Sequence, residues 1–168
     1  MFQLAFSLFK RATEVRIERV ESSDAFLKSM WLEIRAEWFP DREDVDRYNV
    51  IWSSRPQKRT LASCGVERKR VIVARELDRP EYHKYLPALL YHEMCHAILG
   101  PEQSRNGSRR RSWHGRSFKA LERLHPEIAL LDSWIKQGGW AHAVRSDRAR
   151  RSHEKRKRVL KRLSGSSR

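Results

Sequence analysis

The stretch YHEMCHAILG, residues 91–100, limits the possible folds of this chain more than any other. His92 and His96 are four residues apart, and residues at that spacing share one face of a helix. Two imidazoles on one face can bind a single metal ion, and Glu93, about 100° around the helix, can reach a water on that ion. Zinc peptidases use this pattern, with the glutamate as general base. The stretch therefore predicts a metal-binding helix; the alternative is a buried helix with two core histidines.

A catalytic zinc ion takes three protein ligands and keeps a fourth position open. In the metzincin subclass of zinc peptidases, Gly and His would stand where this chain has Leu99 and Glu102. That subclass is therefore excluded, and the third ligand must come from further along the chain. The candidates are His114, at a predicted junction of loop and helix, and Glu122, about two turns further on. Spacing alone leaves both open.

Other segments of the chain have the hydrophobic periodicity of helices or the apolar, β-branched composition of strands. Pro87 suits the first turn of the metal-binding helix, and Gly100 is expected to end it. The three strands are short and close in sequence, so we expect them to form a meander. The fold class predicted is α+β, a three- to four-stranded sheet packed with helices. The expected elements are helices over residues 23–39, 87–99, 113–124 and 126–136, strands over 48–54, 60–66 and 69–77, and a candidate edge strand over 14–20.

The whole chain has a net charge of +15 at pH 7, and most of the positive charge lies in its last third. Residues 1–103 carry 17 Lys and Arg against 16 Asp and Glu, whereas residues 104–168 carry 19 against 5. A near-neutral body joined to a cationic end indicates a polyanionic partner, and we expect DNA bound without sequence specificity. We place the body at residues 1–142, with its core over 23–136, and a basic tail at 143–168 that is helical or disordered.

Two groups of cations are candidates for phosphate contacts, and the alternative for both is a solvated charged surface. The first is the loop SRNGSRRR, residues 104–111, which has no acidic residue and comes shortly before His114. The second is the tail. The candidate nucleic-acid-binding residues are Arg105, Arg109, Arg110, Arg111, Arg150, Arg151, Lys155, Arg156, Lys157 and Arg158.

The order of these motifs resembles the SprT-like metallopeptidase family, which includes the eukaryotic Spartan proteases. The similar stretches are LLYHEMCHAIL, then HGRSFKALERL after a variable gap, and WSSRPQKRTLASCGVERKRVIVARELDR upstream. The resemblance implies a small zincin-like fold with Zn²⁺ bound by His92, His96 and His114, and with Glu93 as the catalytic base. It also implies a protease of DNA-crosslinked proteins, because Spartan proteases cleave such substrates.

The chain departs from the fuller family pattern after Cys95. Many SprT-like proteins carry a C-terminal zinc ribbon with paired cysteines, but here a cationic tail without cysteine stands in that place. We expect a zinc-dependent endopeptidase that acts on DNA-bound or DNA-crosslinked proteins and is localised by the basic loop and tail. The strand RVIVAREL is a candidate to pair with the substrate backbone. The alternative is a non-proteolytic nucleic-acid-binding protein that keeps the zinc-bound fold. Glu93 argues against this alternative, because a structural zinc site does not need that carboxylate.

The cellular location is predicted from what the sequence does not contain. Cys64 and Cys95 form no disulfide framework and fit a reducing compartment, and Cys95 is expected to be inert packing. The apolar start of the chain precedes its charges and has no small-residue cleavage site, which argues against a signal peptide. No apolar run reaches the length of a membrane span. We expect a cytoplasmic monomer with no membrane partner, associated with the nucleoid in a bacterium or nuclear in a eukaryote.

Overall fold

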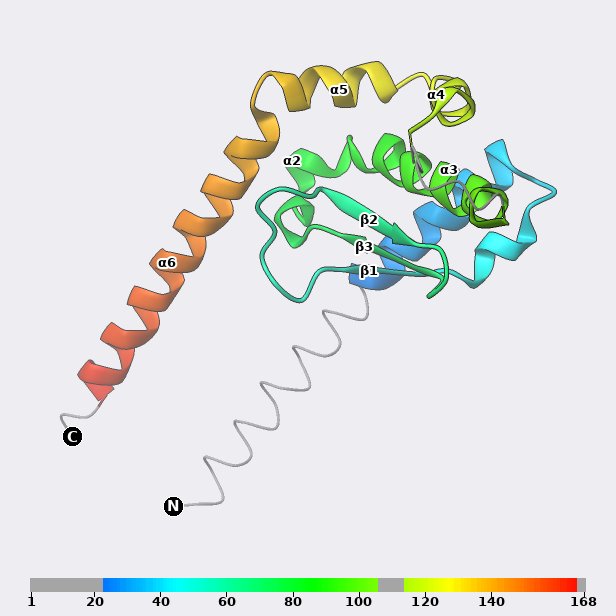
Figure 1. The fold of residues 1–168 in the computed structure, drawn as a ribbon. Coiled ribbons are helices and arrows are strands. Elements are labelled where there is room, and N and C mark those ends of the chain that lie inside the picture. Colours follow the sequence, from blue (N-terminus) through cyan, green and yellow to red (C-terminus); the bar gives the residue numbers. More distant parts are fainter. Residues whose placement is uncertain (1–22, 106–113, 166–168) are drawn as a thin grey trace, which may run out of the picture.

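The computed structural model describes residues 23–105 and 114–165 of this chain of 168 residues. The three strands follow one another in sequence and are flanked by helices on both sides, as expected for an α+β fold (Figure 1). The candidate strand over residues 14–20 lies outside the described residues. The elements are a helix over residues 23–38, η1 (Glu43–Arg47), β1 (Asn49–Trp52), β2 (Ala62–Gly65), β3 (Arg70–Val73), η2 (Arg75–Leu77), α2 (Pro80–His83), α3 (Leu86–Arg105), α4 (Arg116–Glu122), α5 (Ile128–Lys136) and α6 (Gly139–Gly165).

Within the described residues the sheet has three strands in the order β1-β3-β2, so the expected meander is wrong. β3 lies in the middle, parallel to β1 and antiparallel to β2. The physical reason is burial: Val71 and Val73 of β3 are fully buried, whereas β2 alternates half-buried and exposed residues. The most apolar strand takes the middle, and the weaker strand is left at an edge. The predicted third strand is also too long, because η2 follows directly after Val73 and Ala74.

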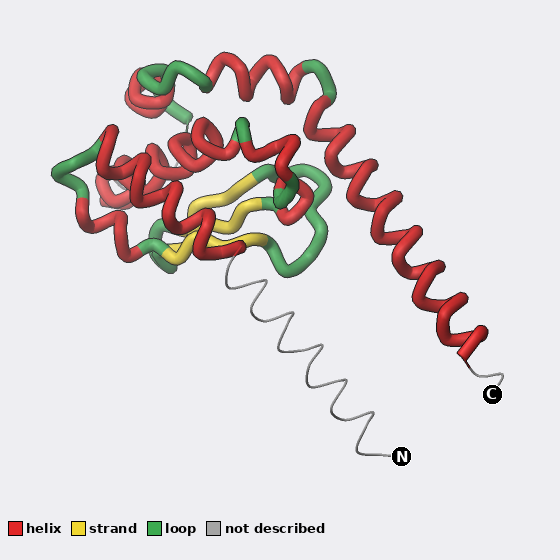
Figure 2. Tube along the Cα trace, turned by 180° about the vertical axis from the view of Figure 1, so that it is seen from behind, coloured by secondary structure: helices red, strands yellow, loops and turns green. Residues whose placement is uncertain are grey.

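Helices cover one face of this sheet. The helix over residues 23–38 lies behind the strands in Figure 1 and in front of them in the reverse view of Figure 2. Its Leu27 and Trp31 are fully buried in the same core as Val50 and Val71 of the sheet, and α3 packs against β2. Trp31 also donates its indole N–H to the Val45 carbonyl at 2.9 Å. The sheet and helices therefore hold α3 in a fixed position over the edge strand.

The helix α3 continues to Arg105 and does not end at Gly100, as the sequence had predicted. Gly100 is buried inside the helix, against the turn that joins β2 to β3. A Cβ built on Gly100 would lie 2.6 Å from Val66 Cγ2, which is closer than side chains approach. The glycine is therefore needed for this close contact between helix and turn, not for the end of the helix.

The last part of the described chain is helical throughout. α5 joins α6 through Gly138, whose φ of +83° favours glycine, and α6 then runs without a break to Gly165, away from the body (Figure 1). Trp140, Ala143 and Asp147 are buried on the inner face of α6, and none of residues 148–164 is buried. The boundary expected between residues 142 and 143 falls inside this helix. No described helix is long and apolar enough to cross a membrane.

Candidate metal centre

Two of the predicted ligands lie one turn apart on α3. His92 and His96 are both half-buried, with ring centroids 5.0 Å apart, so their exposed sides open to the same space. The apolar residues around them, Leu90 and Met94, are fully buried and fix the helix against the core. The 3.6-residue repeat of the helix therefore places both imidazoles on the side of α3 that faces solvent.

His114 comes to the same place from the turn before α4. Its ring centroid lies 5.3 Å from that of His92 and 4.8 Å from that of His96. The fully buried ring of Phe118, one turn into α4, contacts all three imidazoles at centroid distances of 5.0, 4.4 and 4.8 Å. Phe118 therefore forms an apolar floor that holds the histidines together.

The three histidines fit a metal ion. One ring nitrogen of each lies within 4.8 Å of the others. Three converging imidazole nitrogens are the donor set of a His₃ zinc site. Burial, together with the neighbouring histidines, lowers the pKa of His96 to about 4. Burial and His92 also lower the pKa of His114. Metal binding requires neutral imidazole, and these lowered pKa values keep both rings neutral at pH 7.

Glu122, which its spacing had left open as a third metal ligand, has a different role in the structure. It is not one of the converging ligands: its Oε1 lies 2.5 Å from Nδ1 of His92. A carboxylate on Nδ1 keeps the proton there and leaves Nε2 with a free lone pair for a metal. The contact joins the end of α4 to α3 and fixes the His92 ring. The sequence offered Glu122 only as a ligand, because its role depends on how α4 docks.

Removing Glu122 is therefore expected to weaken metal binding. The Glu122→Ala variant loses the acceptor on Nδ1 of His92, and loss of such a partner typically lowers metal affinity about 10- to 100-fold. Competition with a chromophoric chelator measures the zinc affinity. Asp132→Asn, an exposed carboxylate on α5, is the matched control. Equal zinc affinity in Glu122→Ala and the control would contradict the orienting role of Glu122.

Glu93 lies on the buried side of the metal-binding turn, with a side chain that is almost inaccessible. Burial raises its pKa to about 8. The backbone N–H of Cys64 donates a hydrogen bond to the carboxylate, and this bond partly offsets the rise in pKa. The metal-free side chain is therefore protonated at neutral pH. A bound cation next to it would favour the ionised form, because opposite charges within a few ångströms lower the pKa of an acid.

The pKa of Glu93 predicts how the stability of the metal-free protein changes with pH. Below the ordinary pKa of 4.5 the carboxyl is protonated in both the folded and unfolded states. As the pH rises toward 8, the unfolded chain releases this proton and the folded chain keeps it, so the free energy of unfolding falls. Glu93→Gln lacks this effect.

We therefore compare the free energies of unfolding of Glu93→Gln and the wild type. The difference, in favour of Glu93→Gln, is expected to increase by a few kcal/mol between pH 5 and pH 8. Urea denaturation in the presence of a chelator measures it at each pH. Other titrating groups cancel in the difference between the two proteins. A difference that does not change with pH would mean that Glu93 is hydrated in the folded protein.

The histidines and Glu93 open into a pocket of about 320 Å³ whose other wall is β2. Leu61 accepts a hydrogen bond from Ala74 N–H, and in an antiparallel ladder the bonded residues alternate. The backbone groups of Ala62 and Cys64 therefore face away from β3, toward the pocket. RVIVAREL does not provide this edge, because β3 is paired on both sides. Among residues 23–105 and 114–165 no strand pairs with the outer edge of β2, and this edge lies beside the metal centre.

The two cysteines both lie near Glu93. Cys95 is fully buried, as expected, and burial raises the pKa of its thiol to about 12. Cys64 is half-buried and lines the pocket, and burial raises the pKa of its thiol to about 12 as well. Thiolate is the reactive and metal-binding form of cysteine, so neither thiol is suited to ligation in this state.

The residues predicted to bind nucleic acid lie in two regions. Arg105 is the last residue of α3, and Arg109, Arg110 and Arg111 lie outside the described residues. The others are on α6. Arg150 and Arg151 both pair with the buried carboxylate of Asp147, and Arg150 also pairs with Glu154. Beyond Glu154 the cations are exposed and no acidic residue follows. They are Lys155, Arg156, Lys157 and Arg158, together with Lys161 and Arg162.

A small α+β domain in which a helix-borne HExxH motif and one later histidine surround a pocket has the arrangement of a metallopeptidase-type metal centre. A model of the SprT-like family matches residues 27–128, and the chain belongs to that family. The matched part includes all four residues of the site. No curated protein and no solved structure shows a significant match.

Proposed function

We propose that this protein is a zinc-dependent endopeptidase of the SprT-like family. The observation that carries the proposal is the pocket in which three histidines, a buried glutamate and an edge of β2 that pairs with no described strand meet. His92, His96 and His114 would hold the ion, and Glu122 would orient His92 through Nδ1. When bound, zinc lowers the pKa of a coordinated water and polarises the carbonyl of the scissile bond. Glu93 accepts the proton of the attacking water and passes it to the leaving amine.

The free edge of β2 would bind the substrate as an added strand. The N–H and C=O of Ala62 and the C=O of Cys64 face away from β3, and no backbone group of the described residues pairs with them, so they would form the ladder hydrogen bonds to a substrate. Such pairing requires an extended substrate backbone, and its hydrogen bonds do not depend on side chains. We therefore expect cleavage of unfolded or loosely folded segments with little sequence preference.

Nucleic-acid binding is the second part of the proposal. The exposed end of α6 carries six cations between residues 155 and 162 and no carboxylate to neutralise them. Each phosphate that such a helix neutralises releases counterions, so the binding weakens as the salt concentration rises. DNA bound there would bring the peptidase to proteins that are attached to DNA.

The test is cleavage of an unfolded protein substrate and of the same protein crosslinked to DNA. We expect the full chain to cleave both, and to cleave the crosslinked substrate faster at low salt. A chain truncated after Glu154 keeps the ion pairs of Asp147 and should lose only that advantage. Anisotropy of a labelled oligonucleotide reports binding directly. Equal cleavage of the two substrates by the full chain would contradict the role of DNA.

The alternative is a nucleic-acid-binding protein that keeps the metal centre without proteolysis. The burial of Glu93 speaks against it, because a buried ionisable group costs stability and a purely structural site would gain nothing from it. Stoichiometric zinc without cleavage of any unfolded substrate would favour this alternative.

A further inference from the structure

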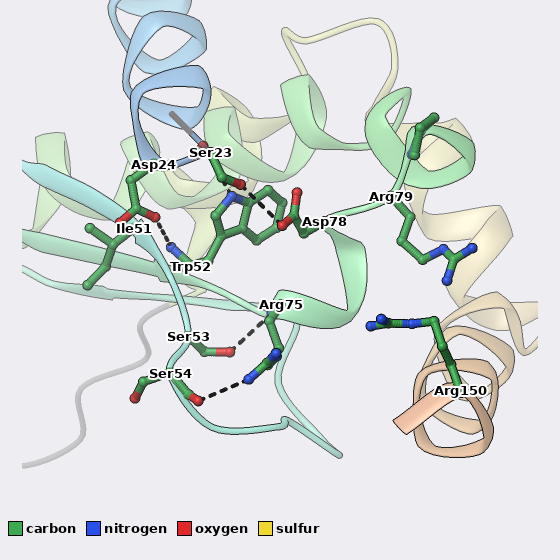
Figure 3. A pocket seen from close by; sticks show the side chains of 11 residues that line it. Ser23, Asp24, Ile51, Trp52, Ser53, Ser54, Arg75, Asp78, Arg79 and Arg150 are labelled. Carbon is green, nitrogen blue, oxygen red and sulfur yellow. Dashed lines mark hydrogen bonds between the residues drawn. The ribbon is translucent and has the colours of Figure 1, made fainter. Parts of the chain in front are cut away.

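A second pocket lies between α6 and the body, and it shares no residue with the metal centre. Its volume is about 790 Å³, and it is lined by the start of the helix over residues 23–38, the end of β1, η2, α2 and α6. Figure 3 shows three arginine side chains at this pocket, from three different elements: Arg75 from η2, Arg79 from the residue before α2, and Arg150 from α6.

These arginines differ in their partners: Arg79 and Arg150 are paired with carboxylates, whereas Arg75 is not paired with one among the described residues. Arg75 donates from Nη1 to the Ser54 carbonyl at 3.2 Å, and among the described residues no carboxylate forms an ion pair with it. The Nε of Arg79 lies 2.8 Å from Glu81 Oε1, but this buried N–H is not directed at an acceptor and forms no hydrogen bond. Arg150 is paired with carboxylates of its own helix and reaches across toward the body.

The pocket also contains two carboxylates, and both already have hydrogen-bond donors. Asp24 accepts the backbone N–H of Trp52 at 2.8 Å, and Asp78 accepts the Ser23 hydroxyl at 3.1 Å. In Figure 3 both lie toward Ser23, whereas Arg79 and Arg150 lie on the α6 side of the pocket. Guanidinium groups from three elements line this one pocket, and Arg75 has no carboxylate partner among the described residues. The α6 side of the pocket is therefore suited to an anionic group.

We propose that this pocket binds a phosphate of a nucleic-acid strand, which continues along α6. Arginine guanidinium groups match phosphate oxygens in a bidentate geometry. Lys157, Arg158 and Lys161 follow Arg150 by seven, eight and eleven residues, so they extend the same face of α6, and all three are exposed. A strand can enter a recess between two elements, whereas a flat membrane surface cannot. The pocket adds Arg75 and Arg79 of the body to the nucleic-acid binding proposed above, on which this inference rests.

The experiment compares two charge-removing variants, Arg75→Gln and Arg79→Gln, with the control Arg123→Gln, an exposed cation just after α4 that does not line the pocket. Arg150 is left unchanged because its loss would leave the buried Asp147 with one partner fewer. Anisotropy of a fluorescent single-stranded oligonucleotide is measured on the full chain over a series of salt concentrations. Thermal melting and zinc content verify that each variant is folded.

We expect each pocket variant to bind about tenfold more weakly, with a salt dependence reduced by about 0.7 in the log–log slope for the lost phosphate contact. The control should match the wild type. Affinity and slope equal to the control in both variants would overturn the pocket, even where truncation after Glu154 still weakens binding and so preserves the role of α6. Binding to anionic lipid vesicles that depends equally on both arginines would also overturn it, in favour of a lipid headgroup. Cleavage of an unfolded substrate without DNA tests the peptidase separately.

Discussion

Replacing Glu93 with Gln is expected to abolish most peptide hydrolysis while the protein keeps its zinc. Glu93 follows His92 in sequence, but its side chain is buried and does not belong to the group of three histidines that would bind the metal. The amide of Gln can occupy the same space and can still accept the Cys64 N–H, but it cannot take a proton from water. Loss of a general base lowers the rate by about 10²- to 10⁴-fold.

The measurement is the initial rate of cleavage of an unfolded protein, together with bound zinc from elemental analysis. Glu127→Gln, an exposed glutamate just before α5, is the matched control and should retain full activity. The two readouts separate chemistry from metal binding. A Glu93→Gln protein that cleaves at the wild-type rate would reject the proposed base, and one that has lost its zinc would mean that Glu93 is needed to assemble the site.

Replacing His114 with Ala is expected to cost the metal itself. Only His92 and His96 remain in that variant, and two imidazoles on one helix leave a zinc ion with too few protein ligands. The loss in zinc affinity should exceed the roughly 100-fold upper range seen when only a partner of a ligand is removed. Zinc raises the melting temperature of a protein that binds it only when folded, so this increase should vanish in His114→Ala.

His142→Ala is the control for this second experiment, because His142 is exposed on α6 and remote in sequence from the site. It should show the same zinc-dependent stabilisation as the wild type. Glu122→Ala is the informative intermediate, with weakened but measurable binding. Wild-type zinc affinity in His114→Ala would remove this histidine from the site and leave the third ligand unassigned.

The parts of the candidate site that can be read from the sequence depend on local geometry. The spacing of His92 and His96 on one helix face follows from the helical repeat alone, and the structure has them there. His114 was one of two candidates from spacing, and only the family resemblance implied it. His114 reaches the other two histidines because Phe118 packs α4 against α3, and these two helices are separated by several residues of the chain.

The errors of prediction concern contacts between distant segments. The order of the strands was wrong because strand pairing is decided by burial against α3 and the helix over residues 23–38, which no local pattern reports. Gly100 has the sequence signature of a helix end, but here it allows Val66 to approach. Glu122 was considered as a ligand because the sequence does not reveal which oxygen faces which ring. The sequence did not single out Arg75 and Arg79 for the same reason. They line one pocket with Arg150 only because α6 passes beside the body.

The hydrogen bond between Glu93 and residue 64 has a consequence for how this site can vary among related sequences. The donor is a main-chain N–H, so the side chain at position 64 has no part in the contact. Substitutions there should be tolerated in any residue type that fits the half-buried space beside the histidines, with one exception. Proline has no N–H and would leave the buried carboxylate without its donor. A family alignment should therefore show a freely variable but proline-free column opposite an acidic column at position 93.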